Sequence, residues 1–182
     1  MKLTTLAIAI LVVITMMPVR AQLRVMTYNV LTGFDWKQDS TRGTTLIEWV
    51  RTQKPDVLAL EEMNGFTEEM LAEFAGKWGH NYSALLKNDG YPVAITSNQP
   101  IVVKERLLKD MWHGMLYCET HGIDFFVIHL SPSDWQFRKR EADIICERIK
   151  QVSGETDKYI VLGDFYAHSP FDAEFNRKYP YQ

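Results

Sequence analysis

Cysteine is scarce in this chain, with only Cys118 and Cys146 among 182 residues. So few cysteines exclude a disulfide-scaffolded domain, and the lack of a Cys-x-x-Cys pair removes the main support for a zinc ribbon or a thioredoxin-like enzyme. Their spacing does not decide whether the two cysteines pair, so a disulfide stays open. Cys146 lies among Ile144, Ile145 and Ile149, a setting that favours a small buried side chain.

The chain also lacks an excess of charge. Its 20 Lys+Arg nearly balance 23 Asp+Glu, and 46% of its residues are hydrophobic. These values exclude a disordered or collagen-like chain and argue against a strongly basic nucleic-acid-binding protein. They do not exclude an enzyme that acts on phosphates, which needs only a local positive field or a metal ion. Neither a Gly-x-Ser-x-Gly nucleophile turn nor a His-Glu-x-x-His helix is present.

The N-terminal segment has the pattern of a secretory signal peptide. Lys2 precedes an apolar run over residues 3–17, and Val19-Arg20-Ala21 forms a small-residue cleavage site before Gln22. As a helix the run would span about 22 Å, short of the roughly 30 Å of a bilayer core, so an uncleaved anchor is the weaker reading. Removing residues 1–21 with their two positive charges leaves 161 residues and changes the net charge from −3 to −5. We therefore expect a secreted or periplasmic protein with no stable membrane span.

Residues 22–182 contain no repeat or linker and predict a single domain of mixed α/β class. Apolar runs predict strands, and apolar residues at helical spacing predict helices. The expected strands cover residues 23–30, 57–60, 82–86, 93–96, 101–103, 117–118, 125–128 and 159–162. The expected helices cover residues 44–52, 67–78 and 133–152, the last with Ser133 as its N-cap and Gln136 at the capping-box position.

Four of the expected strands end in polar residues suited to metal or phosphate chemistry. These residues are Asn29, the pair Glu61 and Glu62, His129, and Asp164. Because strand ends gather at one edge of α/β sheets, we expect them to form one site. Amide and carboxylate oxygens suit Mg²⁺ or Ca²⁺ rather than zinc, and a histidine supplies a proton donor or acceptor near neutral pH.

Each of these residues alone has an ordinary structural explanation, since an aspartate often caps a turn and a histidine often packs in a core. Their recurrence at strand ends is what favours a metal site. Neighbouring side chains on a strand point to opposite faces, so Glu61 and Glu62 are not expected to bind one ion together. One of the two should be a bystander.

Five segments follow one another in a distinctive order: residues 23–30 (LRVMTYNV), 55–62 (PDVLALEE), 91–97 (YPVAITS), 127–130 (VIHL) and 162–165 (LGDF). Together they resemble the endonuclease/exonuclease/phosphatase superfamily, the deoxyribonuclease-I-like group, over residues 23–172. The resemblance implies a four-layer αββα sandwich of two mixed sheets, whereas the residues alone favour a doubly wound parallel sheet. The chain looks like a secreted member of bacterial type.

The resemblance also implies roles for single residues. Asn29 and Glu62 would lie at a divalent metal, and Glu61 stands where the family has a glutamine. His129 matches the histidine that contacts the scissile phosphate and assists proton transfer, and Asp164 matches the aspartate that orients or deprotonates the attacking water. The implied reaction is hydrolysis of phosphodiester or phosphomonoester bonds by in-line water attack. Its cofactor would be Mg²⁺, with Mn²⁺ or Ca²⁺ as alternatives.

Two departures from the family pattern bear on activity. Tyr166 stands where the Gly-Asp-Phe-Asn motif has its asparagine, and this bulkier side chain would fill the site or turn away from it. The family's later Ser-Asp-His segment has no counterpart after Asp164, and His168 is interpreted as a loop histidine rather than a substitute. We expect the domain to lack its C-terminal portion, its second sheet to be incomplete and its activity to be impaired.

The substrate class stays open between nucleic acid, a phospholipid head group and a sugar phosphate. Arg138, Lys139 and Arg140 could contact a polyanion, but their place among acidic residues favours a solvated helix face. A second hypothesis is a catalytically inactive relative of the same fold that binds phosphate or nucleic acid. In either case we expect a monomer.

Overall fold

The computed structural model describes residues 22–152, 158–167, 171 and 173–178. Within these ranges the strands are β1 (Val25–Asn29), β2 (Val57–Glu61), β3 (Tyr82–Leu85), β4 (Ala94–Ser97), β5 (Val102–Leu107), β6 (Met115–Thr120), β7 (Ile123–His129) and β8 (Tyr159–Asp164). The helices are α2 (Leu31–Lys37), α3 (Ser40–Gln53), α4 (Glu68–Gly76), α5 (Trp135–Val152) and α6 (Ala173–Lys178).

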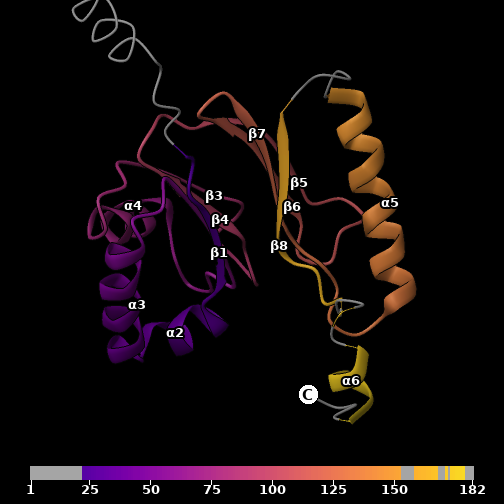
Figure 1. The fold of residues 1–182 in the computed structure, drawn as a ribbon, viewed down its shortest axis with the longest axis horizontal. Coiled ribbons are helices and arrows are strands. Elements are labelled where there is room, and N and C mark those ends of the chain that lie inside the picture. The colour runs from indigo at the N-terminus through magenta and orange to yellow at the C-terminus, as the bar shows by residue number, and fades with distance from the viewer. Residues whose placement is uncertain (1–21, 153–157, 168–170, 172, 179–182) are drawn as a thin grey trace, which may run out of the picture.

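The strands form two four-stranded mixed sheets. The first has the order β1-β2-β4-β3 and the second the order β5-β6-β7-β8. The pairs β1/β2 and β7/β8 are parallel, whereas the other neighbours are antiparallel. The sheets stand face to face, with α3 and α4 outside the first and α5 outside the second (Figure 1). This is an αββα sandwich, and it replaces the doubly wound parallel sheet that the residues alone favoured.

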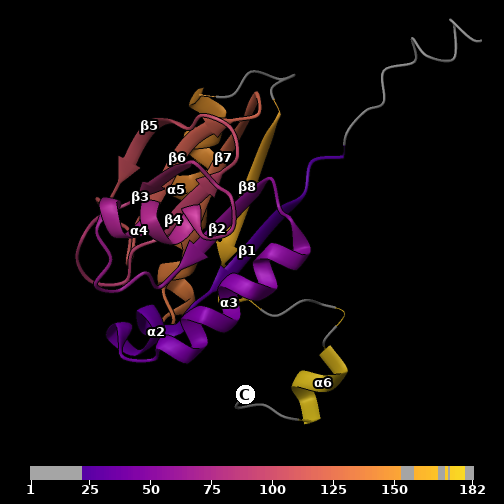
Figure 2. The same cartoon turned by 90° about the vertical axis from the view of Figure 1, so that its left-hand side faces the viewer.

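Alternation along the buried strands builds these layers. Val57 and Ala59 of β2 belong to an apolar cluster that fills the space between the sheets, whereas Leu58 and Leu60 pack with residues of α3 and α4. Figure 2 shows these two helices lying over the first sheet. Each valine or leucine side chain among them contributes about 1.5–3 kcal/mol when it is fully buried. Packing in the core therefore fixes the position of both sheets, and the ends of their strands are fixed with them.

The segment α2 was not expected, and it is left-handed. All residues of Leu31–Lys37 have positive φ angles, between 50° and 69°. Left-handed backbone costs roughly 1–2 kcal/mol per non-glycine residue, so this segment needs support from its surroundings. Phe34 supplies part of it by packing edge-on against Phe74 at 5.5 Å between ring centroids. Gly33 supplies more, because its N–H donates to the carbonyl oxygen of Glu62 at 2.7 Å.

Two expectations are wrong in detail. Helix α5 begins at Trp135, directly after Asp134, and Oδ1 of Asp134 accepts from the N–H of Gln136 at 2.8 Å. Asp134 therefore caps α5, and Ser133 does not. Cys146 is exposed rather than buried, because Ile145 takes the buried position of this helix turn. Cys146 and Cys118 are both free thiols.

Some expectations fall on residues that the structure does not describe. Residues 1–21, interpreted as a signal peptide, and His168 lie outside the described ranges. No helix in the described part of the chain is long and apolar enough to cross a membrane. Each sheet has four strands in that part, so the incomplete second sheet stays a prediction.

Candidate active site

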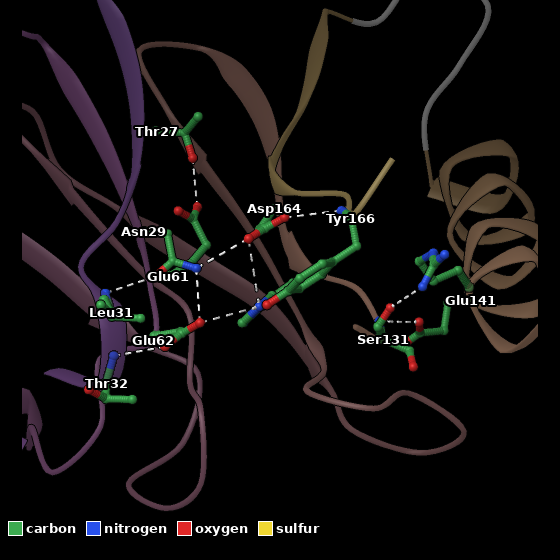
Figure 3. A network of polar contacts seen from close by, with 12 residues as sticks. Thr27, Asn29, Leu31, Thr32, Glu61, Glu62, Ser131, Glu141, Asp164 and Tyr166 are labelled. Atoms are coloured by element: carbon green, nitrogen blue, oxygen red, sulfur yellow. Dashed lines mark hydrogen bonds and ion pairs between the residues drawn. The ribbon is translucent and has the colours of Figure 1, made fainter. Parts of the chain in front are cut away.

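The polar residues predicted from the strand ends lie together in space. The register of the parallel pairs places Asn29 beside Glu61 and His129 beside Asp164. Both pairs stand at the C-terminal ends of their strands, and Glu62 follows directly after β2. Figure 3 shows Asn29, Glu62 and Asp164 pointing toward one another from the two sheets. Each sheet thus supplies half of the site.

The side chain of Asn29 links the two carboxylates. Its Nδ2 donates to Oε1 of Glu62 at 3.0 Å and to Oδ2 of Asp164 at 3.2 Å, while its Oδ1 accepts from the N–H of Leu31. The remaining carboxylate oxygens accept backbone N–H groups, Oε2 of Glu62 from Thr32 and Oδ1 of Asp164 from Tyr166. Both carboxylates are therefore fixed in orientation (Figure 3). The amide presents its nitrogen to them rather than its oxygen.

The imidazole of His129 is buried beside these carboxylates, with a side-chain exposure of 1%. Its Nε2 lies 4.0 Å from Oε1 of Glu62 and 4.0 Å from Oδ2 of Asp164. Neither ring nitrogen has a hydrogen-bond partner among the residues described. Burial lowers the pKa of His129, and the two carboxylates only partly oppose that effect. The ring is therefore neutral at neutral pH and free to accept or donate a hydrogen bond to a bound anion.

Glu61 lies closer to the site than alternation suggested. Glu62 follows the end of β2 with a φ of 60°, so strand alternation does not govern this pair. The carboxylate of Glu61 accepts from the hydroxyl of Thr27 at 2.6 Å and lines the same pocket as Asp164. Burial raises the pKa of Glu61 to about 7, and the charges of Asp164 and Glu62 add to this effect.

A pocket of about 600 Å³ opens next to the site. Arg138 lines it together with Glu61, Asp164 and Tyr166, and its guanidinium donates to the carbonyl oxygen of Ser131 at 2.8 Å. The sequence favoured a solvated face for the whole basic cluster. That is correct for Lys139 and Arg140, which are exposed, whereas Arg138 is half-buried and brings a positive charge to the pocket.

Tyr166 fills the site instead of turning away. Its ring stacks on that of His129, with 5.5 Å between centroids and 12° between planes. Its φ of 46° is left-handed, and its backbone N–H donates to Oδ1 of Asp164 at 3.0 Å. The pocket is lined by Tyr166 rather than by His129.

A second histidine lies against His129. The rings of His113 and His129 are 4.1 Å apart between centroids, with 18° between their planes. Sequence reasoning missed His113 because it belongs to no motif and sits in a loop between β5 and β6. A histidine just before a strand is the only signal, and it is too common to select this one.

Gly163 is required where it stands. Its φ is 132°, and a Cβ atom there would lie 1.9 Å from the carbonyl oxygen of Ile128. These two residues are partners in the β7/β8 pair, so a side chain would push the strands apart. Glycine thus lets β8 approach β7 closely enough to bring Asp164 beside His129.

The carboxylate oxygens of this site could bind a hard cation that needs few protein ligands. No group of three or more His, Cys, Asp or Glu side chains in the described ranges is arranged to hold a metal ion. Mg²⁺ needs fewer, because it keeps several waters and binds through one or two carboxylates. Glu62 and Asp164, joined by the amide of Asn29, match that requirement.

A model of the Endonuclease/Exonuclease/phosphatase family matches residues 26–178 of the chain. No curated protein sequence matches the chain.

Solved structures show the same fold at low sequence identity. The 3' phosphatase NExo from Neisseria, bound to a product DNA hairpin, superposes with a TM-score of 0.66 at 16% identity, over 87% of this chain and 63% of that one. An AP endonuclease from Archaeoglobus fulgidus gives a TM-score of 0.61 at 15% identity, over 84% and 63%. D. rerio TDP2 with a single-strand DNA product gives 0.61 at 17% identity, over 84% and 64%. The chain thus spans less than two thirds of the length of each.

Proposed function

Because the chain belongs to the endonuclease/exonuclease/phosphatase family, we propose that it is an exported, divalent-metal-dependent phosphoesterase. One observation carries the proposal. The buried imidazole of His129 has unpartnered ring nitrogens and faces the gap between Glu62 and Asp164, 4.0 Å from each. A buried polar group without a partner is costly, so this arrangement suits a ligand that accepts hydrogen bonds, such as a phosphoryl group.

Each side chain has a defined task in this hydrolysis. Asp164 is held by Asn29 and by the N–H of Tyr166, so it orients the attacking water and receives its proton. His129 donates to a phosphoryl oxygen and assists proton transfer. Arg138 offers positive charge at the pocket wall. Positioning and electrostatic stabilisation provide most of the rate in such a reaction.

Glu62 is the side chain that would hold the cation, and Asn29 would keep that carboxylate in place. A divalent ion bound there supplies positive charge to the phosphoryl oxygens and the leaving oxygen. Mg²⁺ is the first choice for this all-oxygen environment, with Mn²⁺ and Ca²⁺ as alternatives. Asn29 itself remains a predicted ligand. To bind the cation, its side-chain amide would have to rotate so that Oδ1 rather than Nδ2 faces the carboxylates.

Nucleic acid is the substrate class we favour over a phospholipid head group or a sugar phosphate. NExo and TDP2, which share this fold, were each solved with a DNA product, and this supports the choice. Residues 1–21 carry the proposal of export to a secreted or periplasmic location. We further propose that the exported chain acts as a monomer.

The proposal is tested by release of nitrophenol from bis-p-nitrophenyl phosphate with Mg²⁺. The Glu62→Ala chain should lose at least about 100-fold in rate, because charge stabilisation at the phosphoryl group would be lost. The matched control is Glu73→Ala, which removes an exposed carboxylate of α4 that pairs with Lys77. Equal turnover by wild type and Glu62→Ala would overturn the metal-assisted mechanism.

One observation favours a second candidate, an inactive relative that binds phosphate or nucleic acid. The ring of Tyr166 lies over His129, which is the residue that must reach a substrate. A chain that binds inorganic phosphate or an oligonucleotide but releases no nitrophenol would support this alternative. Turnover above the level of the Glu62→Ala chain would exclude it.

A further inference from the structure

His113 lies outside every predicted motif, yet it makes the closest ring contact with His129. It is buried, with 7% exposure, in the loop between β5 and β6. Its ring lies face to face with that of His129, 4.1 Å apart and 18° from parallel. Tyr91 packs against His113 in turn, at 5.4 Å between ring centroids.

The orientation of His129 has no hydrogen bond to fix it. A working histidine is ordinarily held by a hydrogen bond from one ring nitrogen, which sets the direction of the other. Here both nitrogens of His129 lack a partner within the described part of the chain. Rotation about the bond between Cβ and the ring is otherwise loosely defined. Its plane must therefore be set by packing.

We infer that His113 is a positioning residue, which holds the imidazole plane of His129 so that Nε2 faces the gap between Glu62 and Asp164. The inference rests on the proposed function, because it gives His129 a direction that matters for phosphate. Tyr166 lies nearly parallel to the same ring, at 5.5 Å and 12°. His113 is the closer of the two and comes from the buried side.

A buried carboxylate links the loop that bears His113 to the segment that follows His129. Glu141 of α5 is 0% exposed, and its Oε1 accepts from the N–H of Trp112 at 2.8 Å. Its Oε2 accepts from the N–H of Ser131, also at 2.8 Å. These amides lie one residue from His113 and two residues from His129. Glu141 thus fixes the backbone close to each histidine, so that the two rings are held within reach of each other.

The charge state of His113 suits this role. Burial lowers the pKa of His113 to about 3. The charge of Lys87, and a charge on His129 whenever that ring is protonated, lower this pKa further, whereas the charge of Asp164 opposes them. His113 is therefore neutral across the range in which enzymes work. A neutral ring does not repel the imidazolium that forms when His129 takes a proton.

Two substitutions in the full chain separate a stacking role from simple space filling. His113→Phe keeps a flat ring, whereas His113→Leu keeps a similar apolar bulk without one. With bis-p-nitrophenyl phosphate and Mg²⁺, we expect His113→Phe to stay within about threefold of wild type, because the stacked ring is retained. We expect His113→Leu to lose about 30-fold in kcat with KM within about twofold, because the ring of His129 is misaligned. His121→Asn, in the exposed β6–β7 turn, controls for loss of a histidine.

Equal rates for the Leu and Phe variants would overturn the inference. If both match wild type, His113 only fills space; if both fall together, it acts through its nitrogens rather than its ring.

A second readout does not need turnover. Proton NMR signals of the His129 ring, assigned by their loss in His129→Gln, should keep their ring-current shift in His113→Phe and lose it in His113→Leu. Unchanged shifts and line widths in His113→Leu would overturn the inference even in an active protein. Absence of turnover in wild type, with the shifts behaving as expected, would instead overturn the proposed function alone.

Discussion

Tyr166 is the residue at which the chain departs most visibly from its family's motif. Its ring covers one face of His129 and takes the place of a compact amide. Asparagine at this position would be smaller, would tolerate the left-handed φ of 46° and would leave the imidazole open to the pocket.

The Tyr166→Asn chain should therefore be the better catalyst. We expect its kcat/KM on bis-p-nitrophenyl phosphate to rise by about tenfold or more, because a proton-transfer group becomes accessible. Tyr166→Phe keeps the stacked ring and is the matched comparison; it should show no gain. A Tyr166→Asn chain no faster than wild type would mean that the ring does not restrict access to His129.

Glu61 makes stability depend on pH. Its folded pKa is raised to about 7 from a usual value of 4.5, mainly by burial. The folded state therefore keeps a proton that the unfolded state has already released, and stability falls as pH rises from about 4.5 to about 7. Glutamine, the residue expected at this position from the family, keeps the acceptor for Thr27 but carries no charge.

We accordingly expect Glu61→Gln to be more stable than wild type at pH 8, by about 1–3 kcal/mol in the free energy of unfolding. The difference should shrink toward pH 4.5. Urea unfolding of both chains at several pH values measures this difference. The buried histidines make stability rise with pH, but they are the same in both chains, so their effect cancels when the two free energies of unfolding are subtracted. Parallel curves at all pH values would contradict the raised pKa.

Single residues were predictable where they end an apolar run. Glu62, His129 and Asp164 could be selected because each lies at the C-terminal end of a strand that an apolar run in the sequence predicts. His113 and Glu141 could not, because their roles depend on contacts between α5 and loops that only the fold brings together. Arg138 could not, because only the fold places a pocket beside it. A basic residue in a helix or a histidine in a loop looks the same whether or not a pocket lies beside it.

At the scale of elements, β8 depends on the glycine before Asp164. A Cβ on Gly163 would meet the carbonyl oxygen of Ile128 in β7 at 1.9 Å. We expect Gly163→Ala to lower the free energy of unfolding by about 2–4 kcal/mol, because two paired strands must separate.

The matched control for this change is Gly76→Ala at the end of α4. Apart from its chain neighbours and the backbone of its own helix, no described residue has an atom within 4 Å of a Cβ there. Alanine should therefore stabilise the helix by about 0.5–1 kcal/mol. Urea unfolding of the two variants measures both effects. Similar midpoints for the two would contradict the close approach of β7 and β8.

Elements were predictable where apolar spacing is regular. The run Val57–Leu60 and the helical spacing of residues 44–52 each mark a real element, although α3 starts earlier because Asp39 caps it through the N–H of Arg42. The left-handed α2 had no clear signal, since only Gly33 among its residues favours a positive φ. Contacts with Phe74 and Glu62 impose its backbone, and these are tertiary effects.

For the whole molecule, the alternation of strand-like and helix-like segments predicted the α/β class but not which fold of that class. Alternating strands and helices fit a doubly wound sheet as well as a sandwich, because apolar runs do not say which strands pair. The order of the five family-like segments is what separated the two architectures. The site then follows from the architecture. Because the two sheets stand face to face, the C-terminal ends of β1, β2, β7 and β8 lie together at one edge of the sandwich.

We propose that His129 and Asp164, which are register partners on the paired strands β7 and β8, act as one catalytic unit. Turnover of bis-p-nitrophenyl phosphate by His129→Gln, Asp164→Asn and the double variant tests it most directly. We predict that each single change lowers kcat by about 100-fold or more and that the double variant falls no more than about threefold below the worse single variant. Single variants that turn over at the wild-type rate, or losses that multiply in the double variant, would contradict the claim.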